Sequence, residues 1–137
     1  MRPRFHLAFP VDNLSQARHF YHHILGCALG RSSDQWIDFN FFGHQIVAHL
    51  SREPQQEETN LVDGHQVPKR HFGLLLTKEQ WCQMRERLEQ HEVDFIIAPH
   101  IRFEGQPGEQ ATFFVTDPAG NGLEFKYFAD ESMIFAK

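Results

Sequence analysis

A pattern of one strand, one helix and three more strands occurs twice in this chain of 137 residues. Short apolar runs predict strands, and apolar side chains spaced three or four residues apart predict a helix. In the first half, predicted strands cover 5–11, 36–42 and 45–50, with a helix over 14–25 and a turn around 30–34. In the second half, strands cover 71–76, 93–98, 111–116 and 123–128, and a capping box at 77–80 begins the helix. The repeat indicates an α+β fold of two βαβββ modules.

The composition along the chain sets the expected domain limits. A length of 137 residues fits a single domain, residues 1–137. We predict that its first module covers about 5–50 and its second 71–128, with a C-terminal tail over 129–137. Residues 51–70 are polar and contain two prolines and a glycine, which predicts a linker. A second loop is expected around 99–110.

Charge, cysteine content and hydropathy exclude several classes of protein. The net charge of -5 and the isoelectric point near 6.0 argue against nucleic-acid binding, which requires a basic surface. No apolar run approaches the roughly 20 residues of a membrane span. Two cysteines, Cys27 and Cys82, are too few for a disulfide framework and suit a reducing cytoplasm. We therefore expect a cytoplasmic protein without nucleic-acid or membrane partners, and with an unusual ten histidines.

Three residues at related points of the repeat could hold a metal ion. His6 and His71 lie at the start of the first strand of each half, so related halves could direct both side chains into one shared cavity. Glu124 is a lone acid between apolar neighbours on the last strand, and an interior carboxylate needs a partner. Two imidazoles and one carboxylate form a facial triad that leaves positions open on a divalent metal. A salt bridge from Glu124 to Lys126 or to an arginine is the alternative.

Two runs of sequence resemble one known superfamily. Residues 6–14 (HLAFPVDNL), with Phe20-Tyr21 and Leu25-Gly26, resemble the opening module of the vicinal oxygen chelate superfamily, which includes glyoxalase I, bleomycin- and fosfomycin-resistance proteins and extradiol dioxygenases. Residues 113–125 resemble its closing strand pair. Stretches within 26–49 resemble small proteins described as predicted extradiol-type dioxygenases. The resemblance implies a curved eight-stranded mixed sheet around a central metal cavity.

Residue by residue, the resemblance assigns His6, His71 and Glu124 as metal ligands. Glyoxalase I enzymes often use a further carboxylate on the last strand of the first half, where this chain has Val47. The missing ligand favours the three-ligand arrangement of dioxygenases and fosfomycin-type transferases. His49 lies two residues beyond Val47 and is our candidate catalytic acid or base, with simple packing as the alternative. The adjacent pair His22-His23 is interpreted as part of a solvated helix face, because neighbouring helical residues point apart.

The resemblance leads to three hypotheses for function. The first is a ring-cleaving extradiol dioxygenase in which Fe(II) binds a small catechol-like substrate through vicinal oxygens. The second is a non-redox lyase, isomerase or transferase that uses Mn(II), Zn(II) or Ni(II). The third is a protein that sequesters a ligand without turnover, as drug-resistance relatives do. A homodimer is also implied by the resemblance.

Overall fold

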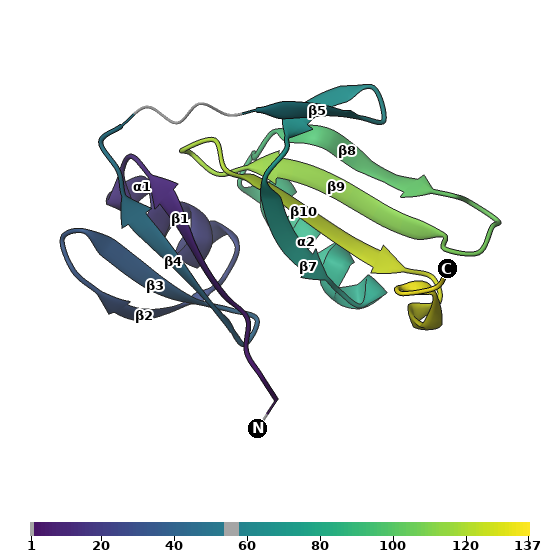
Figure 1. The fold of residues 1–137 in the computed structure, drawn as a ribbon, viewed down its shortest axis with the longest axis horizontal. Coiled ribbons are helices and arrows are strands. Elements are labelled where there is room, and N and C mark those ends of the chain that lie inside the picture. Colours follow the sequence, from purple (N-terminus) through teal and green to yellow (C-terminus); the bar gives the residue numbers. More distant parts are fainter. Residues whose placement is uncertain (1, 54–57) are drawn as a thin grey trace. The chain divides into compact units, whose positions relative to one another are not determined.

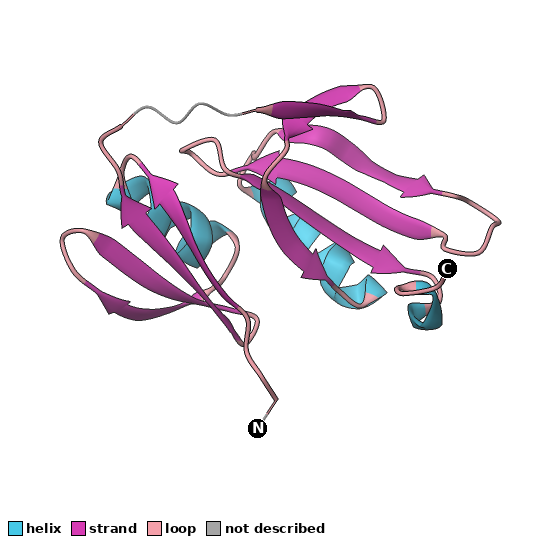
Figure 2. Cartoon of the chain, in the orientation of Figure 1, coloured by secondary structure: helices cyan, strands magenta, loops and turns pink. Residues whose placement is uncertain are grey.

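The computed structural model describes residues 2–53 and 58–137 and divides the chain into two compact units (Figure 1). Unit 1 comprises Met1–Gln56 together with Asp117–Asn121, and unit 2 comprises Glu57–Thr116 together with Gly122–Lys137. Each unit contains one four-stranded mixed sheet and a helical segment (Figure 2). The predicted α+β fold of two βαβββ modules is therefore confirmed.

Unit 1 has the βαβββ order predicted for the first module. Its elements are β1 (His6–Val11), α1 (Leu14–Arg18), the π-helix η1 (His19–Ile24), β2 (Ala28–Ser32), β3 (Trp36–Phe41) and β4 (His44–Leu50). The strand order is β1-β4-β3-β2, and β1 runs parallel to β4. The Asn13 side chain caps α1 by accepting a hydrogen bond from the Gln16 backbone N–H.

The core of unit 1 follows from the alternation of apolar and polar residues along its strands. In β3, Ile37, Phe39 and Phe41 are buried, whereas Asp38 and Asn40 face the opposite side of the sheet. The helical segment packs on the apolar face, where its buried residues include Ala17, Phe20, Tyr21 and Ile24. The polar face of the sheet is thereby left to carry other side chains.

A buried hydrogen-bond network joins the helical segment to the 117–121 turn. The Tyr21 hydroxyl donates to Oδ2 of Asp117 at 2.7 Å, and the Asn121 side-chain amide donates to the same oxygen and to the Pro10 carbonyl. Burial raises the pKa of Asp117, although hydrogen bonds from Asn121, Tyr21 and Ala119 act in the opposite direction. Burial, reinforced by the Asp117 carboxylate, raises the pKa of Tyr21 well above its usual value.

Unit 2 has the topology of the second module. Its main elements are β7 (His71–Leu75), α2 (Lys78–Gln90), β8 (Phe95–Arg102), β9 (Gln110–Thr116) and β10 (Gly122–Phe128), with a short 3-10 helix η2 (Glu131–Met133) in the tail. The strand order is β7-β10-β9-β8, and β7 runs parallel to β10. Thr77 and Gln80 form the predicted capping box at the start of α2.

The two faces of the unit 2 sheet have different coverings. One face packs against α2, and its core includes Trp81, Met84, Leu88, Phe113 and Phe125. On the other face, Phe114 and Ile97 form a small apolar cluster with Val67. This second face also bears Glu124, because Glu124 and Phe114 are paired across β10 and β9.

The structure differs from the expected secondary structure at three places. A strand, β2, occupies the region expected to be a turn around 30–34. The segment expected to be a linker contains the hairpin β5 (Thr59–Val62) and β6 (His65–Pro68), whose turn has positive φ angles at Asp63 and Gly64. The hairpin buries Val67 and Pro68. The polar composition of the segment as a whole gave no sign of these two buried residues. Strand β8 continues through Pro99 to Arg102, into the expected loop, because irregular pairing with β9 accommodates the proline.

Within the described ranges, no helix is long and apolar enough to cross a membrane.

Candidate metal centre

The strand registers place the predicted ligands at related positions of the two units. In unit 1, His6 pairs with Gln45, and two residues further Ala8 pairs with Val47. In unit 2, His71 pairs with Gly122, and two residues further Gly73 pairs with Glu124. His6 and His71 are therefore equivalent in register, and Val47 occupies the position equivalent to Glu124.

The pairing of β7 with β10 depends on a residue without a side chain. A Cβ atom at Gly73 would collide with the backbone carbonyl of Glu124. Glycine allows the two backbones to approach at this point. The close approach brings His71, at the start of β7, next to Glu124 on β10.

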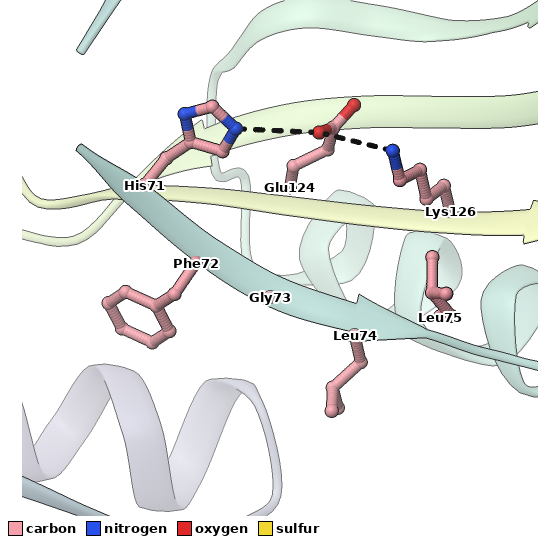
Figure 3. A pocket seen from close by; sticks show the side chains of 7 residues that line it. All are labelled: His71, Phe72, Gly73, Leu74, Leu75, Glu124 and Lys126. Carbon is pink, nitrogen blue, oxygen red and sulfur yellow. Dashed lines mark ion pairs between the residues drawn. The ribbon is translucent and has the colours of Figure 1, made fainter. Parts of the chain in front are cut away.

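A pocket of about 240 Å³ lies along β7 and β10 in unit 2 (Figure 3). His71, Glu124 and Lys126 project from the same face of these strands, as Figure 3 shows. The Glu124 side chain is only 12% exposed, and its Oε1 atom lies 3.6 Å from Nε2 of His71 and 3.9 Å from Nζ of Lys126. The alternative salt bridge from Glu124 to Lys126 is thus present, together with the approach to His71. The remaining lining residues are Phe72, Gly73, Leu74 and Leu75.

Hydrogen bonding defines which nitrogen of His71 is available. Nδ1 lies 3.2 Å from the Pro68 carbonyl oxygen, which can only accept, so Nδ1 carries the hydrogen of the neutral ring. The ring also packs edge-on against Phe114, with centroids 4.9 Å apart. Nε2 consequently presents a lone pair toward the Glu124 carboxylate. A proton or a cation could bridge the Nε2 atom and the carboxylate.

His6 in unit 1 has the same arrangement. Its Nδ1 lies 2.7 Å from Oε1 of Gln45, and the Gln45 amide nitrogen lies 3.4 Å from Oδ2 of Asp38. Because the Asp38 carboxylate accepts from the amide nitrogen, the Gln45 oxygen is directed toward His6. Nδ1 of the neutral His6 ring is therefore the donor, and Nε2 is left with its lone pair.

Val47 and His49 lie on the same face of β4 as Gln45, since alternate residues of a strand share a face. Val47 is 6% exposed and supplies no ligand atom. His49 is exposed and pairs with Pro10 and Trp36. Its register position in unit 1 is the one that Lys126 occupies in unit 2.

The structure brings together only part of the predicted ligand set. His71 and Glu124 are adjacent within unit 2, whereas His6 belongs to unit 1. Over residues 2–53 and 58–137, no three His, Cys, Asp or Glu side chains are grouped to hold a metal ion.

Sequence reasoning missed the residues that orient the predicted ligands. Thr112 is 2% exposed, and its hydroxyl donates a 2.6 Å hydrogen bond to Oε2 of Glu124. Gln45 and the Pro68 carbonyl hold the two imidazoles. Thr112 could have been noticed as a hydroxyl in an apolar strand, on the face of Glu124. The role of Pro68 carries no sequence signal, because it uses only a backbone atom.

The two βαβββ units define a class of fold, and comparison with known proteins identifies it. A sequence profile of the Glyoxalase/Bleomycin resistance protein/Dioxygenase superfamily matches residues 5–125. The chain belongs to this superfamily. No match was found among curated proteins.

Solved structures of similar proteins cover almost the whole chain. A glyoxalase/bleomycin resistance protein/dioxygenase from Alicyclobacillus acidocaldarius is 36% identical, with a TM-score of 0.84, 97% of this chain covered and 96% of that one. The fosfomycin resistance protein FosX from Listeria monocytogenes shares the fold at 15% identity, with a TM-score of 0.72 and coverage of 97% and 98%. Lactoylglutathione lyase from Agrobacterium tumefaciens shares it at 16% identity, with a TM-score of 0.66 and coverage of 98% and 97%.

Proposed function

We propose that this protein is a metal-dependent enzyme with ring-cleaving dioxygenase chemistry on a small catechol-like substrate. Its metal ligands are His6, His71 and Glu124, and Fe(II) is the preferred ion. The observation that carries the proposal is the approach of Nε2 of His71 to Oε1 of Glu124 at 3.6 Å. Two ligand atoms at about 2.1 Å from one ion lie about 3–3.6 Å apart, depending on the angle at the metal. The pair therefore has the spacing of two ligands to one cation.

The tautomers of both histidines support the same ligand set. Metal-binding histidines commonly donate their second ring nitrogen to a carbonyl or a carboxylate, which fixes the ring and directs the lone pair at the metal. His71 donates to the Pro68 carbonyl, and His6 donates to Gln45, which in turn is held by Asp38. Each imidazole thus has its Nε2 lone pair available.

The valine at position 47 supports chemistry that needs open coordination positions. Three protein ligands leave room for two substrate oxygens and for dioxygen. When bound, Fe(II) would acidify the substrate hydroxyl groups and bring substrate and oxygen together. A fourth carboxylate at position 47, as glyoxalase I enzymes often have, would occupy one of these positions.

Residues of this chain supply the remaining functions. The Lys126 ammonium lies on the face of Glu124 and is 30% exposed, so it can attract an anionic catecholate. We assign His49 as the group that moves a proton, because an imidazole ring can both accept and donate one. Its exposed position on the face of Gln45 and Val47 allows contact with a substrate.

The oxygenase is tested with protein loaded anaerobically with Fe(II). We expect oxygen uptake and a coloured ring-cleavage product from at least one member of a catechol panel. His71→Ala and Glu124→Gln should abolish both the activity and one equivalent of Fe(II) binding. His91→Ala, at an exposed position after α2, is the matched control. Tight Mn(II) or Zn(II) binding without oxygen uptake would instead support the non-redox alternative.

Two other outcomes are distinguishable. Ligand binding that survives His6→Ala, with no turnover, would indicate sequestration. Metal binding that is unchanged in all three ligand variants would exclude the site itself.

We also propose a homodimer on the basis of the family resemblance, and light scattering at several protein concentrations will determine the mass.

A further inference from the structure

Three histidine rings gather on the helical segment of unit 1, where sequence reasoning expected side chains that point apart. The rings of His19 and His23 have centroids 5.5 Å apart, and those of His22 and His23 are 4.9 Å apart. All three residues belong to the π-helix η1. None of them is required by the proposed function.

The π-helical turn explains why these rings are close. The Leu25 backbone N–H bonds to the Phe20 carbonyl, five residues back rather than four. A turn that holds more residues spreads successive side chains over a smaller angle, so adjacent histidines diverge less than in an α-helix. Residues four apart still share one side of the helix, which aligns His19 with His23.

A hydrogen bond fixes His22, which packs against His23. Its Nδ1 lies 2.7 Å from the Cys27 carbonyl oxygen, which holds the half-buried ring in place. The edge of this fixed ring packs against His23. The orientation of His23 is therefore restricted, whereas His19 is exposed.

We propose that His19 and His23 form a second metal site, a two-histidine chelate for a divalent transition ion such as Cu(II), Ni(II) or Zn(II). Two imidazoles on one tetrahedral ion at about 2.0–2.1 Å have ring centroids about 5 Å apart, close to the observed 5.5 Å. Both side chains are exposed, so an ion can reach them and complete its coordination with water.

The surroundings favour a soft or borderline cation over Mg²⁺ or Ca²⁺. The site offers imidazole nitrogens, which suit Zn, Cu and Ni, whereas hard cations prefer oxygen ligands. His22 and His23 lie in the last turn of the helical segment, where the negative end of the helix dipole attracts a cation. The order of affinities should follow Cu(II) above Ni(II), with Zn(II) below Cu(II).

Calorimetric titration with NiCl₂ tests the site, using the 137-residue protein that carries His71→Gln and Glu124→Gln to remove the proposed catalytic centre. In that background we expect one equivalent of Ni(II) to bind and to raise the unfolding midpoint. Adding His19→Gln or His23→Gln should weaken binding at least tenfold, and adding His91→Gln should not. His22→Phe keeps a packing ring without a ligand nitrogen and loses only the hydrogen bond to Cys27, so binding should fall less than in the His19 and His23 variants.

Three results would overturn the proposal: equal binding by the His19, His23 and His91 variants, a loss of binding in the His22→Phe variant as large as in the His23→Gln variant, or no bound equivalent at all. The proposed function has a separate readout. In the otherwise native protein, His19→Gln should leave Fe(II) loading and oxygen uptake unchanged, so failure of either proposal does not affect the other.

Discussion

The Thr112 hydroxyl holds Oε2 of Glu124 at 2.6 Å, and this bond turns the other carboxylate oxygen toward His71. In the pairing of β9 with β10, Thr112 is directly opposite Lys126. Glu124 lies two residues before Lys126 on the same strand, so it is a diagonal neighbour of Thr112. Diagonal neighbours on one sheet face are within reach of each other's side chains. A buried hydroxyl thus determines which oxygen of Glu124 is available.

Replacing Thr112 by Val should test this relationship. The change keeps the shape of the side chain and removes the hydrogen bond to a charged group, so we expect a loss of about 1.5–3 kcal/mol in the free energy of unfolding. Metal affinity should fall about 10–100-fold, as for other residues that orient ligands. Urea denaturation and metal titration measure the two effects. Thr116→Val on the same strand is the control, and equal metal affinity in both variants would contradict the assigned role.

Gln45→Leu should weaken metal binding through His6. Without the Gln45 oxygen, Nδ1 of His6 loses its acceptor, so the ring is free to rotate and to change tautomer. We expect about a 10–100-fold lower affinity with little change in the unfolding midpoint of the metal-free protein, because the residue is exposed. Competitive titration with a chelating dye measures the affinity. Gln16→Leu on α1 is the control and should bind metal as the natural protein does. If Gln45→Leu also binds metal with unchanged affinity, His6 is not a ligand.

Val47→Glu places a carboxylate at the register position equivalent to Glu124. A charged group at this 6% exposed site should destabilise the metal-free protein, since burial disfavours the ionised form. Added Zn(II) or Mn(II) should recover more stability in this variant than in the natural protein, and oxygen uptake should fall as the fourth ligand fills an open position. Val47→Gln is the uncharged control. Thermal unfolding with and without metal measures this gain in stability. An equal increase of the unfolding midpoint on adding metal to Val47→Glu and Val47→Gln would argue that position 47 is not close to the metal.

Tyr21→Phe should destabilise unit 1 in a pH-dependent manner. Burial raises the pKa of Asp117 in the folded state, so the contribution of this group is fully present below its unfolded pKa, about 3.9, and is lost as the pH rises through the folded pKa. Removing the Tyr21 donor raises that pKa further and makes the loss larger. We expect a cost of about 1.5–3 kcal/mol at pH 7 and a smaller one at pH 3.5.

Urea unfolding at the two pH values measures this difference. Tyr127→Phe is a control with the same chemical change, because Tyr127 packs against Trp81 in unit 2 and is outside the Asp117 network. A Tyr21→Phe cost that is equal at pH 3.5 and pH 7 would show that Asp117 does not titrate with folding.

Sequence reasoning succeeded where one physical signal dominated. Alternation in residues 36–42 predicted β3, and the hydroxyl-to-amide pattern at Thr77 and Gln80 predicted the capping box of α2. The relation between His6 and His71 was also predicted, because each lies at the start of the first strand of its half. The registers with β4 and β10 then follow from the same topology.

Other features depend on contacts that no local pattern encodes. Strand β2 is exposed at every position and has no apolar alternation, so only its pairing with β3 makes it a strand. Hairpin β5–β6 is recognised by the burial of Val67 against Ile97 and Phe114, residues far along the chain. The gathering of His22 and His23 arises from a π-helical turn, which an α-helical projection of the sequence cannot represent.

The turn at 117–121 belongs to unit 1, although the strands on either side of it belong to unit 2. The polypeptide therefore passes between the units three times, and the Tyr21 hydroxyl obtains its acceptor from a residue 96 positions away. A fragment ending near residue 56 would leave that hydroxyl buried without Asp117. Unit 1 is therefore completed by a turn from the C-terminal half of the sequence, so exchanging residues 57–137 for another sequence would also remove the acceptor of Tyr21.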